Sequence, residues 1–181
     1  MKLKVTTLIL ALCMGVCSYA QKIVYTEASE FPVYGKISTE TNERYERLPA
    51  KLENVSRKEV WKLGRSSAGL YIRFRSNSSS VHLRWEAMFN NSMNHMTDTG
   101  TKGMDLYTIH DGGWRHVCSA RPTGRHNTTA VIRHMDPVER EYMLYLPLYD
   151  GVTSLEIGVD NDAYIEQPAV QRPSVEKPVV M

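Results

Sequence analysis

The sequence is poor in cysteine. It holds three cysteines in 181 residues, and Cys13 and Cys17 lie in an apolar N-terminal stretch, which leaves Cys118 alone in the remainder. If that stretch is removed, no intramolecular disulfide can form. The fold must then be held by an apolar core, and a chain of this length can bury one. One domain is expected.

The chain also lacks a surplus of charge of one sign. Its 22 Lys and Arg residues oppose 20 Asp and Glu residues. Residues 1–20 contain two lysines and no acid, so the rest of the chain is neutral when its histidines are uncharged. A nucleic-acid-binding protein needs a basic surplus, and a membrane-surface protein needs a polybasic face. The composition therefore argues against nucleic acid and against a membrane surface as partners.

Signatures of catalysis and of metal binding are missing as well. Gly64-Arg65-Ser66 is a lone Gly-x-Ser, and no aspartate stands three residues before any of the six histidines. A nucleophilic serine needs a nearby base and an orienting acid, so Ser66 is interpreted as a turn residue. No Cys/His group has zinc spacing, and Asp160-Asn161-Asp162 lacks the glycine of a calcium-binding loop. We expect no catalytic residue, no metal and no cofactor.

What the sequence does contain begins with a signal-like N-terminus. Lys2 and Lys4 precede an apolar run over residues 5–16, and Ser18-Tyr19-Ala20 follows as a cleavage-site pattern. This layout predicts a secretory signal peptide over residues 1–20, cleaved after Ala20. The run is short for a membrane span. We therefore expect a secreted or periplasmic protein with no membrane attachment after cleavage.

Alternation of apolar and polar residues dominates the rest of the chain. It marks strands over residues 70–75, 81–86, 105–110, 114–118, 128–134, 142–146 and 155–159. Two turn signals, Asp111-Gly112-Gly113 and Asp150-Gly151, each predict a hairpin between neighbouring runs. Residues 49–53 could form one helical turn at most. Short strands at regular spacing predict an all-β fold, an antiparallel β-sandwich of jelly-roll type, with Trp85 in its core.

The C-terminal residues have the composition of a linker. Residues 167–181 contain Pro168, Pro173 and Pro178, and the sequence given closes on Val179-Val180-Met181. A proline-containing segment is typical of linkers, and the apolar residues after it resemble the start of a buried strand. We therefore predict a domain over residues 21–166 and a linker over 167–181 near a domain boundary. A frayed tail is the alternative.

One long polar segment, residues 89–103, is a candidate binding loop. Long loops inside compact domains are often functional. Asn94 and His95 could contact a substrate or a neighbouring domain, and Arg65, in a second turn, is a weaker candidate for the same face. A packed loop without function is the alternative. The aromatic residues could instead form a sugar-binding platform, supplied by Trp61, Trp85, Trp114, Tyr71 and Tyr107, of which Trp85 is expected in the core.

A family resemblance starts from Gly103-Met104-Asp105-Leu106-Tyr107. These residues match Gly-x-Asp-Leu-Tyr, so the chain resembles the GxDLY domain at the N-terminus of bacterial SGNH-hydrolase-type (GDSL-like) esterases. The resemblance spans residues 25–159, and three further segments occur in the order expected of the family: Arg47-Leu48-Pro49-Ala50-Lys51, Ser67-Ala68-Gly69-Leu70-Tyr71-Ile72-Arg73-Phe74 and Tyr145-Leu146-Pro147-Leu148-Tyr149-Asp150-Gly151.

The resemblance implies a β-sandwich that precedes an α/β SGNH hydrolase domain in the same polypeptide. Residues 177–181 look like the opening of that domain's first strand, and no position of this sequence matches its catalytic residues. The implied function is that of an accessory domain in a secreted esterase that acts on acyl or acetyl esters, with a carbohydrate ester as a candidate substrate. The alternatives are a free-standing carbohydrate-binding module and a purely structural domain. An exposed aromatic strip would favour the module, and a broad apolar patch would favour the accessory domain.

Overall fold

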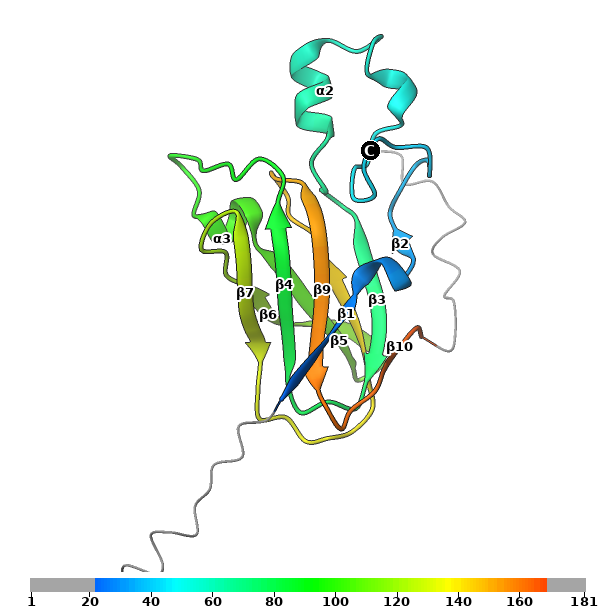
Figure 1. Ribbon diagram of the computed structural model, residues 1–181, viewed down its shortest axis with the longest axis vertical. Helices are drawn as coiled ribbons and strands as arrows, with labels where there is room; N and C mark the ends of the chain where they lie inside the picture. Colours follow the sequence, from blue (N-terminus) through cyan, green and yellow to red (C-terminus); the bar gives the residue numbers. More distant parts are fainter. Residues whose placement is uncertain (1–21, 169–181) are drawn as a thin grey trace, which may run out of the picture.

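The computed structural model describes residues 22–168. The predicted signal peptide over residues 1–20, its cleavage site after Ala20 and residues 169–181 of the predicted linker lie outside the described residues. Two antiparallel β-sheets pack face to face (Figure 1). The predicted all-β, jelly-roll-like sandwich is confirmed, and buried apolar residues of both sheets form one core cluster.

The two sheets differ in size. The smaller sheet has four strands in the order β1 (Ile23–Glu27), β9 (Val152–Asp160), β4 (Val81–Ala87) and β7 (His126–Ile132). The larger has six, in the order β10 (Ile165–Glu166), β3 (Tyr71–Ser76), β8 (Arg140–Tyr145), β5 (Met104–His110) and β6 (Gly113–Ala120), with β2 (Val33–Tyr34) also paired to β3. All seven predicted strands exist, whereas β1, β2 and β10 were not predicted.

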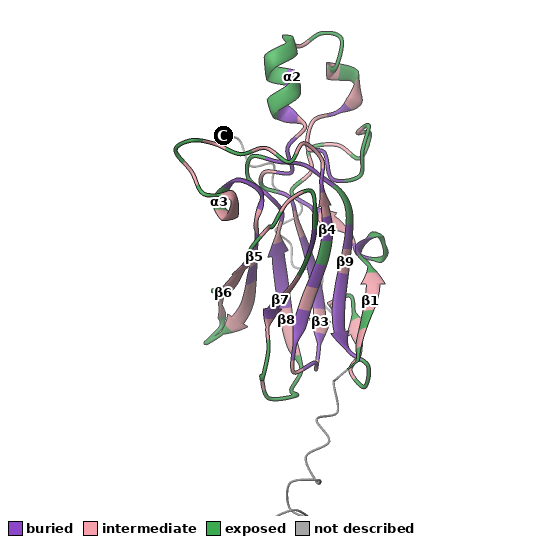
Figure 2. Ribbon diagram, turned by 60° about the vertical axis from the view of Figure 1, so that its left-hand side comes forward, coloured by how far each residue is buried: buried purple, intermediate pink, exposed green. Residues whose placement is uncertain are grey.

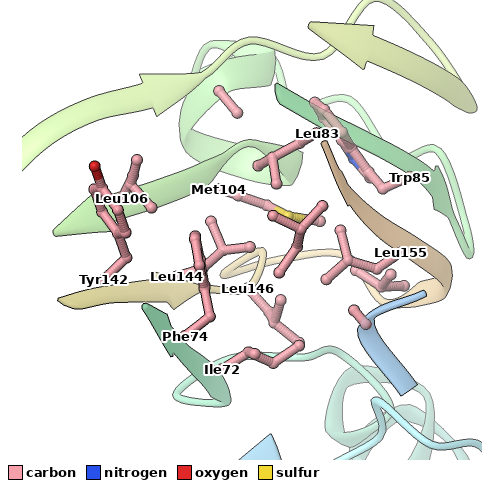
Figure 3. Packing of buried hydrophobic residues seen from close by; sticks show 14 of the residues in the cluster. Ile72, Phe74, Leu83, Trp85, Met104, Leu106, Tyr142, Leu144, Leu146 and Leu155 are labelled. Carbon is pink, nitrogen blue, oxygen red and sulfur yellow. The ribbon is translucent and has the colours of Figure 1, made fainter. Parts of the chain in front are cut away.

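The core lies between the sheets and follows the predicted alternation. Along β4, Val81, Leu83 and Trp85 are buried and the residues between them are not. Their side chains meet inward-facing residues of the larger sheet, such as Phe74 and Leu144 (Figure 3). Successive side chains of a strand point to opposite faces, so one face of each strand supplies the core. Trp85 is 2% exposed, which confirms its predicted place.

The connections between the sheets differ from the prediction in one place. The hairpin around Gly112 is confirmed, because β5 and β6 pair directly and Gly112 adopts a positive φ of 74°. The second predicted hairpin, around Asp150-Gly151, is wrong. Strand β8 pairs with β3 and β5, while β9 pairs with β1 and β4 in the other sheet. Residues 146–151 therefore cross between sheets. The alternation of apolar and polar residues identifies which face of a strand is buried. It does not identify the strand with which that strand pairs.

A second crossover, from β3 to β4, is closed by a buried carboxylate at the opposite end of the sandwich. The side chain of Asp160 accepts hydrogen bonds from the hydroxyls of Ser78 (2.9 Å), Ser79 (2.7 Å) and Ser80 (2.6 Å). It also accepts the backbone N–H groups of Ser79 at 2.9 Å and Ser80 at 3.1 Å. A buried charge is tolerated when it is hydrogen-bonded in this way. The serine-rich segment thus serves as a structural ligand of Asp160.

Four short helices complete the fold within residues 22–168. They are η1 (Ala28–Glu30), η2 (Ala50–Leu52), α2 (Lys58–Gly64) and α3 (Asp98–Lys102). The single turn expected in residues 49–53 is confirmed as η2, but α2 was not predicted. It stands beyond one end of the sandwich, apart from both sheets (Figure 1). No helix within residues 22–168 is long and apolar enough to cross a membrane.

Candidate functional site

A shallow hollow of about 300 Å³ lies at the end of the sandwich that carries α2. Four segments surround it: the chain at Arg47, α2 with the turn after it, the start of the 89–103 segment, and the crossover from β8 to β9. Its wall is mainly apolar, with cationic residues at its edge; the wall includes Leu63, Ala68, Phe89, Leu148 and Tyr149, and the cations are Arg47 and Lys62.

Helix α2 forms one side of the hollow and is mostly exposed (Figure 2). Only Trp61 and Gly64 are buried. Gly64 is needed because a Cβ there would lie 2.0 Å from Cδ1 of Leu48, so the helix backbone rests directly on that side chain. The side chain of Leu63, by contrast, is 67% exposed. The helix is thus attached through one side and leaves apolar surface free on another.

The crossover from β8 to β9 forms the second side and is pinned by Asp150. This residue is fully buried. Its Oδ1 accepts the backbone N–H groups of Phe89 at 2.9 Å and Gly151 at 2.8 Å, and its Oδ2 accepts that of Asn91 at 2.8 Å. The carboxylate therefore holds the start of the 89–103 segment against the crossover. Beside it Leu148 and Tyr149 turn outward, with 52% and 41% of their surface exposed.

The far end of the 89–103 segment is held by a buried lysine. Lys102 Nζ donates to Asn90 Oδ1 at 2.8 Å and pairs with Asp98 Oδ2 at 3.1 Å. A hydrogen bond from Ser92 and the ammonium of Lys102 hold the pKa of Asp98 below its usual value. The expectation of an irregular loop is therefore corrected in part, because its last residues form α3 and are packed.

Asn94 and His95 lie at the exposed turn of this segment. Met93 and Met96 form a β-bridge that closes the turn. Asn94 Oδ1 and His95 Nδ1 are hydrogen-bonded at 3.0 Å, and both side chains are exposed. Anchors at Asp150 and Lys102 fix both ends of the segment, so this turn projects from a firm base. Contact of Asn94 and His95 with a substrate or another domain stays a prediction.

Arg65 sits at the base of the same end. Its Nε pairs with Oε1 of the fully buried Glu46 at 2.5 Å, and its guanidinium lies over the ring of Phe89 at 5.7 Å from the centroid. Leaving a buried carboxylate without a partner is costly, so this pair has a structural use. Arg65 joins the end of α2 to the start of the 89–103 segment. The structure brings Arg65 to the start of that segment, at Phe89, while a shared role with Asn94 and His95 stays a prediction.

The Gly-x-Asp-Leu-Tyr motif opens β5, and two of its residues have clear packing roles. A Cβ on Gly103 would lie 2.3 Å from the carbonyl oxygen of Thr99 and 2.8 Å from that of Ala120. A side chain is therefore excluded where the end of α3 meets β6. Leu106 is fully buried in the core. Glycine and leucine thus fix the start of this strand.

The other two motif residues, Asp105 and Tyr107, face outward from the larger sheet. Ser119 donates its hydroxyl to Asp105 Oδ1 at 2.6 Å, and His116 Nε2 lies 3.2 Å from Ser119 Oγ and 3.7 Å from Asp105 Oδ1. A catalytic triad places the imidazole between hydroxyl and carboxylate, with a different nitrogen toward each. Here one nitrogen faces both, and the serine donates to the aspartate. This cluster is therefore a cross-strand hydrogen-bond group and not an activated nucleophile.

Tyrosines line the same outer face. Tyr34 stacks on Tyr71 at 5.3 Å between centroids, and Tyr145 contacts both Tyr71 (5.2 Å) and Tyr107 (5.6 Å). Burial, followed by the neighbouring phenols, raises the pKa of Tyr145. The planes of Tyr71 and Tyr145 are inclined by 47°, and those of Tyr107 and Tyr145 by 76°. These rings pack on one another and do not form a coplanar surface, which a sugar platform requires. Trp61, also considered for that platform, is buried.

Metal binding has no support in the described part of the chain. Residues 22–168 contain no group of three or more His, Cys, Asp or Glu residues arranged to hold an ion. Asp160, the first residue of the acidic segment considered for calcium, is occupied by the serine hydroxyls. The hollow itself was not predicted. Its only signal in the sequence is Leu148-Tyr149, two large apolar residues within a turn.

Comparison with known proteins gives a consistent result. Residues 23–165 match the family described as GxDLY, the N-terminus of SGNH-hydrolase-type esterases. The fold matches the crystal structure of a protein described as a GDSL-like lipase from Bacteroides ovatus, with 36% identity and a TM-score of 0.76 over 81% of this chain and 43% of that one. It also matches a salicylyl-acyltransferase from a tetracycline biosynthetic pathway, with 13% identity and a TM-score of 0.55 over 86% of this chain and 44% of that one. No curated protein matches by sequence. The chain thus spans less than half of either structure.

Proposed function

Because the chain belongs to the GxDLY family of N-terminal domains of SGNH-hydrolase-type esterases, we propose that it is the accessory domain of a secreted esterase. The observation that carries the proposal is the match to the Bacteroides ovatus structure, which at 36% identity extends over only 43% of that chain. In this proposal residues 1–20 direct export and are cleaved after Ala20, residues 21–166 form the domain, and residues 167–181 lead to a hydrolase domain in the same polypeptide.

The proposed reaction is hydrolysis of an acyl or acetyl ester, and a carbohydrate ester is a candidate substrate. A serine of the hydrolase domain would attack the ester carbonyl, with backbone amides and a polar side chain holding the oxyanion. The chain's own serines support this division of labour. Ser66 donates to the carbonyl oxygen of Leu63 at 3.0 Å, and Ser119 donates to Asp105. Neither hydroxyl is placed against a general base in the way that catalysis requires.

The 89–103 segment would contribute to the substrate cleft from outside the hydrolase domain. Asn94 and His95 would reach the edge of the cleft, with Arg65 behind them on the same end. Amide and imidazole groups can bind hydroxyls or a carbonyl without a fixed negative charge. Met93 and Met96 beside them offer adaptable apolar contacts to a partner. The support for this role is the exposure of the turn and the two buried anchors at its base.

The test uses the natural esterase polypeptide. Asn94→Ala and His95→Ala should lower kcat/KM on the ester that the enzyme hydrolyses, because contacts near the reacting group are lost. Their Tm should stay near that of the wild type. Asn161→Ala and His110→Ala, which truncate exposed residues at the opposite end, serve as matched controls. Wild-type kinetics in both test variants would remove the loop from the site, and a parallel loss of stability would make its role structural.

The accessory assignment has a simpler test with the chain by itself. The purified protein should hydrolyse para-nitrophenyl acetate no faster than an inert protein at the same concentration, because its serines lack the required geometry. Turnover that Ser119→Ala or Ser66→Ala abolishes would show that the chain carries its own nucleophile, and it would replace the accessory role with a catalytic one.

A further inference from the structure

Exposed apolar side chains gather around the hollow at the α2 end. Leu63 on α2 and Leu148 and Tyr149 on the facing crossover line the hollow, and Val60 stands on α2 three residues before Leu63; each is at least 41% exposed. Single exposed apolar residues are normal on a protein surface. Several that surround one hollow form a patch, and such patches mark contact sites. We call these four residues and the hollow between them the α2-end surface.

The length and packing of helix α2 indicate that a further body covers it. Seven residues are too few for a stable isolated helix, which depends on packing of its apolar side chains. Here only Trp61 and Gly64 are buried. Val60 and Leu63 remain open to solvent in the part of the chain that the structure describes. A second body packed on them would bury the apolar surface that the domain leaves uncovered.

The charge of the residues around the hollow indicates what kind of partner could bind there. Residues 46–65 contain six cationic residues and three acidic ones, and Arg65 is already paired with Glu46; the other cations are Arg47, Lys51, Arg57, Lys58 and Lys62, and the other acids are Glu53 and Glu59. The rest of the described chain has more acids than bases. Two copies that met symmetrically through this surface would place cation against cation, which is unfavourable. The surface therefore suits a partner of different sequence with carboxylates at its contact.

We propose that the hydrolase domain of the same polypeptide packs on the α2-end surface, with an apolar side chain in the hollow and carboxylates facing Arg47 and Lys62. This inference rests on the proposed function. A domain on the same chain is present at high effective concentration, so the apolar surface is covered from the time of folding. Interfaces between domains of one chain bury about 600–1,500 Å², which is large enough to include all four residues.

The length of the chain allows this placement. The last described contact of the C-terminal side is the hydrogen bond from Gln167 Nε2 to the carbonyl oxygen of Glu30, at 2.9 Å. The eight residues from 169 to 176, which precede the predicted first strand of the following domain, could span about 28 Å if extended. A nine-residue strand such as β9 is about 30 Å long. A linker of this length is nearly as long as that strand, so it allows the following domain to lie at the α2 end.

The first experiment compares hydroxyl-radical labelling of this chain by itself with labelling of the natural esterase polypeptide. Leu63, Leu148 and Tyr149 should react in the chain alone and be severalfold protected in the two-domain protein. Val24 and Val138, which are exposed elsewhere, should react equally in both. Unprotected α2-end residues would overturn the inference and leave the accessory role intact. A natural polypeptide without a hydrolase domain would overturn the proposed function and the inference with it.

A matched pair of variants gives a second readout. Leu148 and Val138 are each 52% exposed and both lie outside strands and helices. In the two-domain protein, Leu148→Asp should separate the unfolding of the two domains into two calorimetric transitions, because a carboxylate would then be buried against the apolar side chain that fills the hollow. Val138→Asp should keep the wild-type profile. If Leu148→Asp also keeps it, the hydrolase domain does not pack on this surface.

Discussion

The two ends of the sandwich use the same device and reach different results. At each end a buried aspartate closes a crossover between the sheets. Asp160 accepts bonds from the three serines of its own crossover, and those serines are buried or half-buried. Asp160 also accepts two backbone N–H groups of that crossover, whereas Asp150 accepts three backbone N–H groups, two of them from the neighbouring 89–103 segment. Binding the backbone leaves the side chains free to project. One end is therefore complete in itself, and the other presents a surface.

The largest expected effect comes from the core that both ends share. Trp85→Ala should lower the free energy of unfolding by about 3–5 kcal/mol, because it removes a large buried side chain from the inner face of β4. Both ends should unfold together in one transition, followed by tryptophan fluorescence and by circular dichroism. Trp85→Phe should cost less, since the indole N–H is buried without a hydrogen bond. Separate transitions would mean that the two ends are independent units.

The next largest effect should come from removing the carboxylate of Asp160, at the end of the sandwich where the crossover from β3 to β4 is closed. Asp160→Ala removes the acceptor of the Ser79 N–H and of the Ser79 and Ser80 hydroxyls, and breaking a buried charged network of this kind costs roughly 3 kcal/mol. Chemical denaturation should show a lower midpoint with an unchanged slope. Asp160→Asn, which keeps the shape, should lose less. Equal losses in the two variants would show that shape, not charge, matters here.

Low pH should lower the stability that the hydrogen-bonded carboxylate of Asp160 provides. Burial raises the pKa of Asp160, but hydrogen bonds from Ser80, Ser79 and Ser78 outweigh burial and hold that pKa below 3.8. A carboxyl with a depressed folded pKa stabilises the fold above its unfolded pKa of about 3.9 and loses that contribution as pH falls further. The Tm of the wild type should therefore fall more steeply below about pH 4 than that of Asp160→Asn. Parallel curves would contradict this linkage.

At the presenting end the expected effect is smaller and local. Asp150→Ala frees the backbone amides of Phe89 and Asn91, and the loss should be about 1–3 kcal/mol. Hydrogen exchange should speed up at residues 89–91 while the strands of the core keep their protection. Uniformly faster exchange through β4 and β9 would place Asp150 in the same class as Asp160, and the contrast between the ends would fail.

The smallest effect concerns the exposed apolar residues. In this chain by itself, Leu148→Asp should change the free energy of unfolding by no more than about 0.5 kcal/mol, because surface substitutions rarely do more. Denaturation of the variant beside the wild type measures the difference. A loss of about 2 kcal/mol in the free energy of unfolding would mean that Leu148 packs against the domain itself. The α2 end would then have less uncovered apolar surface than the exposure of Leu148 indicates.

Most of the sheet framework could be predicted because alternation records burial directly. Val81, Leu83 and Trp85 marked one strand, and Gly112 marked a hairpin. The turn at Asp150-Gly151 misled because its sequence fits a hairpin equally well, and only packing determines which sheet receives β9. Strands β2 and β10 have two residues each, too few for a pattern. Helix α2 was missed because the exposure of Val60 and Leu63 breaks the usual amphipathic pattern.

The candidate site, like the fold, could be predicted from the sequence only in part. Composition alone marked the 89–103 segment and the exposed turn at Asn94 and His95. It could not show that Lys102 is a buried anchor, since a lysine is normally a surface residue. It also could not show that Leu148 and Tyr149 face solvent, because apolar residues next to a strand are expected to continue into the core. Whether an apolar residue at the end of the sandwich is exposed depends on how the folded segments pack there, and the sequence alone does not show this.

The place of β9 in the smaller sheet has a consequence for synthesis. This strand lies between β1 and β4, and its register joins Ile23 to Asp160. A ribosome therefore makes both neighbours long before the strand that connects them. Folding must close a loop of most of the domain, and such high contact order slows it to milliseconds or longer. Until β9 emerges, β1 and β4 present open edges that can pair with other nascent chains. Slowed translation across residues 152–160 should therefore reduce yield by aggregation.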